Sequence, residues 1–175
     1  MSVITRSIVV LPPYQFALQH RFLYCQSNCE QKGDIQMANI NSYLTFNGNC
    51  LEAMTFYKEC LGGELIIQTV GELGLPLAEP MPPCMEKCIV HSTLINGSIV
   101  LAASDMVPET GLIKGNSVSL LLNCNSEEEA RTIYAKLSTD GEATHPLEDT
   151  FWGAIFGDLT DKFGTHWLIN FEDPY

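Results

Sequence analysis

Two stretches of the chain carry the same succession of patterns, and this internal repeat constrains the fold more than any other feature. In each stretch a strand pattern, at 40–46 and again at 116–124, leads into a helical pattern that begins at Asn49 or at Ser126. Three further strand patterns follow each helix. Each stretch therefore predicts a β-α-β-β-β unit, and units of about 60 residues are too small to be stable alone, so we expect them to share a core.

The two units match residue by residue through their helices. Asn49 with Glu52 three positions later, and Ser126 with Glu129, predict a capping box at the start of each helix. The same register pairs other helix residues, Ala53 with Ala130 and Tyr57 with Tyr134. The units are therefore interpreted as copies of one another.

The remaining strands are bounded by turn signals. Asn96-Gly97, between two of them, is a strong hairpin signal. The expected strands are 64–70, 88–95 and 98–104 in the first unit, and 142–149, 151–160 and 165–171 in the second. The prediction for the whole chain is an N-terminal extension at 1–36 and one domain at 37–175, made of module 1 (38–105), a linker (106–115) and module 2 (116–172).

The extension at 1–36 differs from the rest of the chain. Its one apolar stretch, "SIVVLPPYQFAL", is interrupted by Pro12 and Pro13, and no small-residue cleavage site follows it, which does not match a secretory signal. We hypothesise that Met37 is the true start, because the codons of "KGDIQM" can spell a ribosome-binding site ahead of it. The gene's nucleotide sequence tests this. The alternative is a native tail, disordered or packed on a partner.

Charge and cysteine content exclude several classes of protein. A net charge of −12 argues against binding to nucleic acid or to an anionic membrane, because phosphate contacts need a basic surface. No apolar run approaches the roughly 20 residues that span a bilayer. The seven cysteines are odd in number and scattered, and Cys84-x-x-x-Cys88 lacks the second pair of a zinc site. These features predict free thiols in the reducing cytoplasm.

Three segments carry a resemblance to a known family. "YLTFNGNCLEAMTFYKECLGGEL", "CIVHSTLINGSIVLAASD" and "HPLEDTFWGAIFGDLTDKFGTHWLIN" together resemble the PhnB-like branch of the vicinal oxygen chelate superfamily, which includes glyoxalase I, bleomycin-resistance proteins and extradiol dioxygenases. The resemblance spans 38–172. It implies an α+β fold, with two βαβββ modules forming a curved eight-stranded mixed sheet around a cup, usually as a homodimer.

The resemblance also implies where a metal would sit. Glyoxalase-type members hold a divalent metal with four side chains, one each on the first and fourth strands of each module. Counting from the helix caps and turn glycines places these positions at Ser42, Leu101, Ser119 and Leu168. Serines and leucines do not supply the imidazole and carboxylate ligands that such a metal needs, and a slip of one residue does not supply them either. We therefore expect no metal and no other cofactor.

Two residues of the first module are the catalytic candidates. His91 lies mid-strand between apolar neighbours and suits a general base or a substrate hydrogen-bond partner in the cup. The alternative is a half-buried histidine bonded to a neighbouring strand. Asp105 ends a strand pattern and either orients His91 or caps the following turn.

The ligand-binding candidates come from both modules. Ser42 and Ser119 lie on the first strands, and Trp152 and Phe156 suit aromatic cup walls. His166 shares the side of Leu168 and is expected in the cup, or else at its exposed rim. Trp167 falls on the opposite face and is expected to pack under the second helix.

Other polar residues are given structural interpretations. Asp158 and Asp161 suggest a pair of catalytic carboxylates, but Asp161 is better explained as bonding the backbone amides of its own turn. His145 precedes Pro146 in an expected edge strand and is treated as a surface residue. No thiol lies in an activating context. The sequence has no phosphate loop and no dinucleotide or methyl-donor fingerprint.

The predicted function follows from the resemblance and from the missing ligands. We expect a cytoplasmic PhnB-like homodimer that binds an unknown small organic molecule in its cup without the usual metal, and that binds neither nucleic acid nor membrane. The acidic chain favours a cationic ligand. The alternative is a metal-independent isomerase, lyase or transferase that uses His91 as acid and base.

Overall fold

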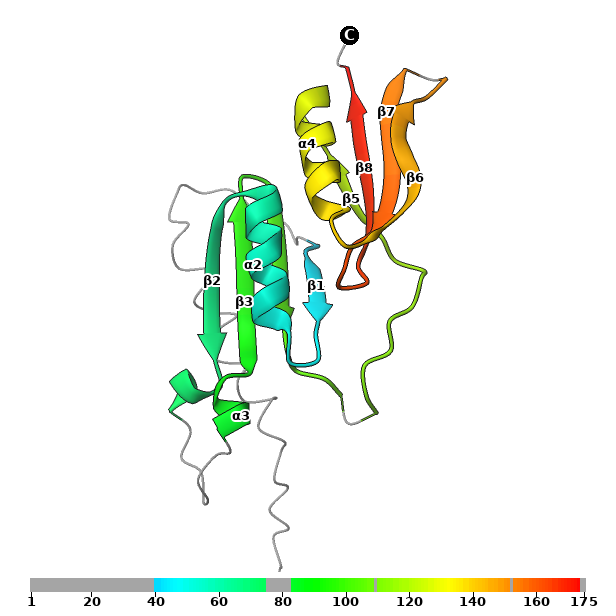
Figure 1. Cartoon of the computed structure of the whole chain (residues 1–175). Coiled ribbons are helices and arrows are strands. Elements are labelled where there is room, and N and C mark those ends of the chain that lie inside the picture. The colour runs from blue at the N-terminus through cyan, green and yellow to red at the C-terminus, as the bar shows by residue number, and fades with distance from the viewer. Residues whose placement is uncertain (1–39, 75–82, 109, 152, 174–175) are drawn as a thin grey trace, which may run out of the picture. The chain divides into compact units, whose positions relative to one another are not determined.

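The computed structural model describes residues 40–74, 83–108, 110–151 and 153–173 (Figure 1). The two modules described next belong to one compact unit, Asn41–Tyr175. The predicted extension at 1–36, with the hypothesis that Met37 is the start, lies outside the described residues.

The first module has the predicted order of elements. It consists of β1 (Ser42–Thr45), α2 (Cys50–Leu61), β2 (Glu64–Thr69), β3 (Ile89–Asn96) and β4 (Ile99–Ser104), with the short helices η1 (Gly71–Leu73) and α3 (Pro83–Glu86) between β2 and β3. The strands pair in the order β1-β4-β3-β2. β1 runs parallel to β4, and the other pairs are antiparallel.

The second module repeats this topology. It consists of β5 (Leu120–Asn123), α4 (Glu127–Leu137), β6 (Glu142–Asp149), β7 (Ala154–Thr160) and β8 (His166–Glu172). The order β5-β8-β7-β6, with β5 parallel to β8, is the order of the first sheet. The predicted repeat and the α+β class are confirmed, and the eight strands pair as two four-stranded sheets, one per module.

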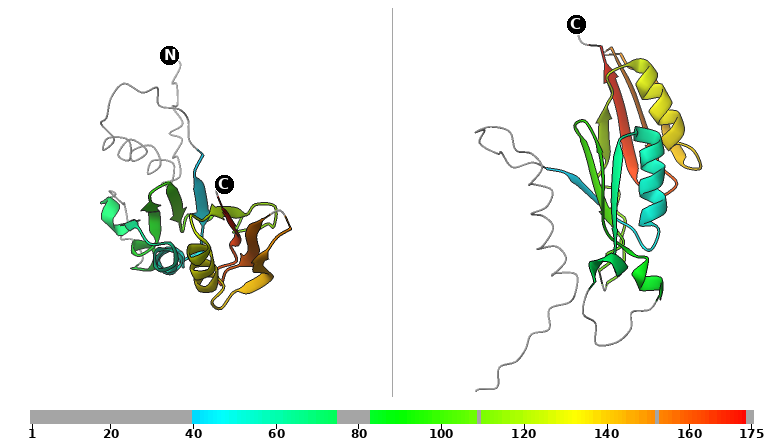
Figure 2. Two further views of the ribbon diagram at one scale, coloured as in Figure 1. Left: turned by 90° about the horizontal axis from the view of Figure 1, so that it is seen from above. Right: turned by 90° about the vertical axis from the view of Figure 1, so that its left-hand side faces the viewer.

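One helix covers one face of each sheet (Figures 1 and 2). The buried cluster between helices and sheets includes Tyr57 and Met54 of α2, Leu137 of α4, and the strand residues Leu94 and Ile169. The turned view of Figure 2 shows α2 and α4 beside each other, on the same side of the sheets. We call the two sheet faces that carry no helix the first open face, for β1–β4, and the second open face, for β5–β8.

The two helices begin differently. At α4 the Ser126 half of the predicted capping box is confirmed, because Ser126 Oγ accepts a hydrogen bond of 3.1 Å from the N–H of Glu129, while Glu129 Oε2 accepts from the N–H of Asn125 at 2.7 Å. At α2 the predicted capping box is wrong, because Asn49 makes no side-chain cap hydrogen bond. The carboxylate of Asp105 accepts hydrogen bonds of 2.9 Å from the N–H groups of Gly48 and Cys50 instead. A residue at the end of β4 therefore caps α2.

A buried carboxylate joins the two modules. Oδ1 of Asp161 accepts hydrogen bonds of 2.9 Å from the N–H groups of Phe163 and Thr165, which confirms the predicted turn role. Oδ2 accepts from the hydroxyl of Tyr57 at 2.7 Å and from Trp167 Nε1 at 2.8 Å. Asp161 is 3% exposed. Burial, followed by the nearby Asp161 charge, raises the pKa of Tyr57, so its hydroxyl remains a donor.

Aromatic packing surrounds this carboxylate. Tyr57 contacts Trp167 edge-on, with ring centroids 5.5 Å apart, and contacts Phe163 at 6.1 Å. Trp167 is 3% exposed and belongs to the core beneath α4, as the sequence predicts. Edge-on aromatic pairs of this kind add to the stabilisation from apolar burial. The modules thus meet through Tyr57 of α2 and the β7–β8 turn.

We expect replacement of Asp161 to loosen this junction. The Asp161→Asn variant places an amide NH₂ among groups that all donate, and we expect it to lower the free energy of unfolding by about 3 kcal/mol. Urea denaturation measures this. The matched control is Asp149→Asn on β6, an exposed position, where the change should stay within about 0.5 kcal/mol. Equal effects at the two positions would contradict the assigned role of Asp161.

Candidate functional site

The strand registers align equivalent rows of side chains across the two open faces. On the first, one row runs through Tyr43, Ala102, Thr93 and Ile66 on neighbouring strands. On the second, the corresponding row runs through Leu121, Leu168, Asp158 and His145. We call these two sets the first row and the second row. They occupy the same place in the two modules, so their chemistry can be compared position by position.

The structure places the two expected ligand positions of the first module, Ser42 and Leu101, on the side of β1 and β4 that faces the core. Leu101 is 2% exposed and belongs to the helix-covered core. Ser42 pairs with Leu101 and shares the side of Leu44, which packs against that core. Its hydroxyl donates to the carbonyl of Val100 at 3.2 Å. A role of Ser42 in binding a ligand stays a prediction, but the open face at this level carries Tyr43.

The two expected positions of the second module, Leu168 and Ser119, lie on β8 and just before β5. Leu168 pairs with Leu121 and alternates with the buried Trp167 and Ile169, so it lies on the second open face. Ser119 is exposed and precedes β5 by one residue. Its role in ligand binding stays a prediction.

The side chains on the first and last strands do not fit the divalent metal of the glyoxalase type. Where the two rows cross these strands they supply one phenol and three aliphatic groups: Tyr43, Ala102, Leu121 and Leu168. Zinc and similar cations need imidazole, thiolate or carboxylate ligands. Within the part of the chain that the structure describes, no three His, Cys, Asp or Glu residues group to hold a metal ion.

His91 lies on the first open face. It shares the side of Thr93 on β3, opposite the buried Ser92 and Leu94. Its Nε2 is 2.9 Å from Thr93 Oγ1, and its ring centroid lies 6.2 Å from that of Tyr43. The side chain is half-buried. His91 is therefore placed where a ligand on this face would meet it, and its catalytic role stays a prediction.

Asp105 is engaged in holding the backbone. Besides Gly48 and Cys50, it accepts a hydrogen bond from the N–H of Ile89 at 3.0 Å through Oδ2. Both oxygens thus tie the start of α2 to the start of β3. This arrangement explains a structural role for Asp105, while a role in orienting His91 stays a prediction.

The remaining candidates belong to the second module. His166 is half-buried on the second open face, with Nε2 3.1 Å from Thr160 Oγ1. Phe156 lies on the same face, opposite Asn170 and half-buried. Trp152 lies outside the described residues.

A histidine–aspartate pair on the second open face was missed by sequence reasoning. His145 Nδ1 lies 2.6 Å from Asp158 Oδ2, across β6 and β7. The His145 side chain is 72% exposed and the Asp158 side chain 19%. A simple strand alternation would place His145 on the same face as Leu147, and only the register shifts on either side of His145 change this. The signal available in sequence was Pro146, which favours an irregular strand.

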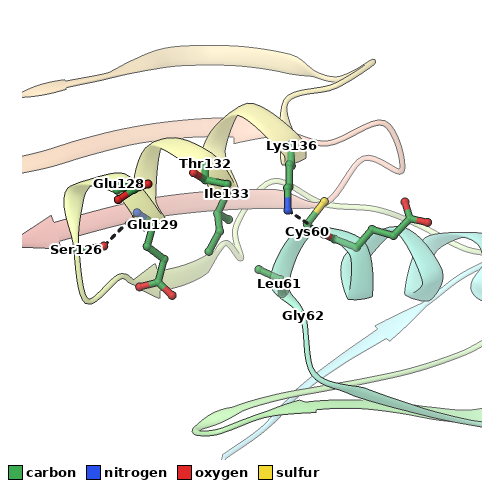
Figure 3. Close-up of a pocket in the computed structure, with 10 residues that line it drawn as sticks. Cys60, Leu61, Gly62, Ser126, Glu128, Glu129, Thr132, Ile133 and Lys136 are labelled. Atoms are coloured by element: carbon green, nitrogen blue, oxygen red, sulfur yellow. Dashed lines mark hydrogen bonds between the residues drawn. The ribbon is translucent and has the colours of Figure 1, made fainter.

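A hollow of about 390 Å³ lies outside the open faces, between the C-terminal end of α2 and the side of α4 that runs from Ser126 to Lys136 (Figure 3). Its lining mixes polar and apolar groups, and Lys136 Nζ donates to the carbonyl of Glu59 at 3.1 Å across it. The same lysine and the Ser126 cap are thus already engaged. The hollow lies between the two helices.

The cysteines among the described residues are free thiols. Burial raises the pKa of Cys50 to about 12 and the pKa values of Cys60 and Cys124 to about 11. These three thiols are neutral at physiological pH, and the thiolate is the nucleophile. The environments of Cys50, Cys60 and Cys124 thus agree with the interpretation that no thiol is activated.

Two repeated βαβββ modules, each with one covered and one open sheet face, define a fold class that comparison with known proteins identifies. Residues 39–169 match the model of the Glyoxalase/Bleomycin resistance protein/Dioxygenase superfamily, and the chain belongs to this superfamily. No helix among the described residues is both long and apolar enough to cross a membrane.

The individual relatives include a PhnB protein. Protein PA1353 from Pseudomonas aeruginosa is 37% identical, with a TM-score of 0.67 over 79% of this chain and 100% of that one. The PhnB protein from Bacillus cereus is 26% identical, with a TM-score of 0.61 over 77% and 99% of the two chains. Protein YjdN of Escherichia coli K12 is 29% identical over 137 residues, 75% of this chain and 93% of YjdN.

The start of α2 allows the observed cap, Asp105, to be tested against the cap predicted from sequence, Asn49. We expect Asp105→Ala to lower the free energy of unfolding by about 2 kcal/mol, because three backbone N–H groups lose their acceptor. Asn49→Ala should change it by less than about 0.5 kcal/mol, since its side chain makes no cap hydrogen bond. Chemical denaturation of both variants checks this. The reverse order of effects would restore the predicted capping box.

Proposed function

We propose that this PhnB-like protein binds a small organic molecule in a cup formed by its open faces, without the metal of the glyoxalases. The observation that carries the proposal is the character of the two rows. They combine aromatic and aliphatic side chains with a few polar ones, which is the composition of small-molecule sites. At the first and last strands, where relatives hold a metal, they carry groups that do not ligate one.

A second copy of the chain completes the cup in this proposal. Large apolar side chains on the open faces are solvent-exposed: Tyr43 is 48%, Ile66 47% and Leu121 56% exposed. Such groups gain stabilisation when a partner covers them. The free thiols of the described residues suit the reducing cytoplasm that the sequence predicts.

The polar groups of the first open face set the ligand contacts. His91, with Nε2 2.9 Å from Thr93 Oγ1, places an imidazole on this face, and Tyr43 beside it offers an aromatic surface. Phe156 and Leu168 supply apolar contacts on the second face. The net charge of −12 favours a ligand that carries a positive charge.

An enzymatic version of this function uses His91 as acid and base in an isomerisation, lysis or group transfer. The placement of His91 on an open face, beside Tyr43, favours this second candidate. The imidazole ordinarily exchanges a proton near neutral pH, which suits such a step.

The oligomeric part of the proposal is tested by a matched pair of substitutions. Leu121 and Leu51 are similarly exposed, at 56% and 51%, but Leu121 lies on an open face and Leu51 on α2. We expect Leu121→Asp to convert a dimer into a monomer in light-scattering measurements, because a charge is costly in an apolar interface. Leu51→Asp should remain dimeric. A wild-type monomer, or equal behaviour of the two variants, would contradict the dimeric cup.

The ligand part is tested on protein purified without chelators. Native mass spectrometry should find a small organic molecule bound to the wild-type protein, and elemental analysis should find no stoichiometric transition metal. We expect His91→Asn to bind less of the molecule while its unfolding free energy changes by less than about 1 kcal/mol, because its side chain lies on the surface of the core. A stoichiometric metal would overturn the metal-free cup. Full retention by His91→Asn would remove His91 from it.

A further inference from the structure

We propose that His145 and Asp158 form a proton-accepting dyad on the second open face, which takes a proton from an O–H, N–H or activated C–H group of the bound molecule. This inference rests on the proposed function, because the molecule reaches the dyad through the cup. It assigns the proton transfer to His145, with Asp158 as its positioning residue.

The geometry of the pair determines which ring nitrogen faces the ligand. Nδ1 of His145 lies 2.6 Å from Asp158 Oδ2, so the neutral ring donates its Nδ1–H to the carboxylate. Nε2 then carries the lone pair. When Nε2 takes up a proton, Nδ1–H can keep its hydrogen bond to the carboxylate. The carboxylate therefore fixes the tautomer and orients the ring.

The pairing of the edge strand β6 with β7 is irregular on both sides of His145. The β6–β7 register shifts between Ala143 and His145, and again between His145 and Glu148. As a result His145 reaches Asp158 on the open face, whereas Leu147, two residues further, packs against the core. Bulges that re-aim one side chain are frequent beside active sites. A regular strand would have turned His145 to the covered face or Leu147 to solvent.

A tyrosine holds both members of the dyad from the covered face. The hydroxyl of Tyr134 donates to the backbone carbonyl of His145 at 2.9 Å and approaches that of Asp158 at 3.5 Å. Burial, followed by the Asp158 charge, raises the pKa of Tyr134, which keeps this donor protonated. One side chain of α4 thus fixes the two strands at the level of the dyad.

Gly157 makes this approach possible. A Cβ at this position would lie 2.9 Å from the Cα of Leu147 and 3.0 Å from Cε2 of Tyr134. These distances are shorter than side chains allow, so the absence of a side chain lets β6 and Tyr134 close on β7. The glycine precedes Asp158 in the chain, and its packing therefore positions the carboxylate directly.

The surroundings of the dyad suit a partly apolar ligand. Leu168 of β8 pairs with Asp158, and Phe156 lies two residues before Asp158 on the same face. The His145 ring is 72% exposed, and the Asp158 side chain is 19% exposed beneath it. A molecule on the open face meets the ring before the carboxylate.

The step needs no co-reactant beyond the ligand and water. The lone pair of Nε2 forms the new N–H bond, and the electron pair of the broken O–H, N–H or C–H bond stays on the ligand. The proton then returns to another ligand atom, which gives an isomerisation, or leaves to water after an elimination. No oxidation or reduction accompanies it.

Nitrogen NMR of the histidine rings tests the dyad without any ligand. In the full-length protein at mildly alkaline pH, we expect His145 to be protonated at Nδ1 and unprotonated at Nε2. Asp158→Asn should let the proton move to Nε2 in most molecules, as in free imidazoles. Glu148→Gln removes an equal charge from β6, the strand of His145, and should leave the tautomer unchanged. A wild-type ring protonated at Nε2 would overturn the inference.

A generic proton-abstraction probe tests the chemistry. In 5-nitrobenzisoxazole a base removes the carbon-bound proton, the N–O bond breaks, and a nitrile and a coloured phenolate form. We expect His145→Ala to reduce the rate above buffer to zero and Asp158→Asn to reduce it about tenfold or more. Glu148→Gln should match the wild-type protein.

If His145→Ala had the same rate as the wild-type protein, the inference would be overturned. The same holds if Asp158→Asn had the wild-type rate. A merely structural cross-strand pair predicts such equality, because both variants would fold and His145 would carry no chemistry. These outcomes are separable from failure of the proposed function. That failure shows in the oligomeric state and in the retained molecule, whereas the tautomer depends on neither.

Discussion

The buried carboxylate of Asp161 is the contact on which the arrangement of the two modules depends. It accepts from Tyr57 of α2, from Trp167 of β8 and from two backbone groups of its own turn. A buried charge is tolerated only when donors surround it, and here the donors come from both modules. Folding of the β7–β8 turn and docking of the first module are therefore coupled. If either event occurs alone, the carboxylate of Asp161 lacks some of its donors.

Because the modules dock through this turn, one face of each sheet takes no part in the junction. The contact uses the helix side of each module, with α2 and α4 beside each other (Figure 2). Nothing in this junction draws on the opposite faces of the strands, and their apolar residues stay exposed, among them Tyr43 and Leu121. Because the covered faces form the core of the chain, the open faces are left for the ligand and the second copy that we propose.

The sequence predicted what depends on local pattern and failed where distant residues decide. The repeat, the strands, the Ser126 cap and the turn role of Asp161 are local and were correct. The cap of α2 comes from Asp105, 55 residues after Cys50, which local pattern cannot contain. Counting back from the helix caps did not select equivalent strand positions in the two modules. Residues 46–49 separate β1 from α2, whereas only 124–126 separate β5 from α4. A shift of one residue reverses the face of every strand side chain. His145 was missed for the same reason, because two register shifts turn it to the open face.

The comparison of the two rows suggests how a metal-dependent scaffold can carry other chemistry. On the first and last strands of the second module, the row holds Leu121 and Leu168, which cannot ligate a cation. On the two remaining strands, the same row holds Asp158 and His145, while the first row has Thr93 and Ile66 there. The polar side chains of the second row thus lie on the edge hairpin, and not on the strands where the resemblance to glyoxalases places metal ligands. In the mechanism that we propose, an imidazole held by a carboxylate transfers protons, where a metal ion would polarise a substrate.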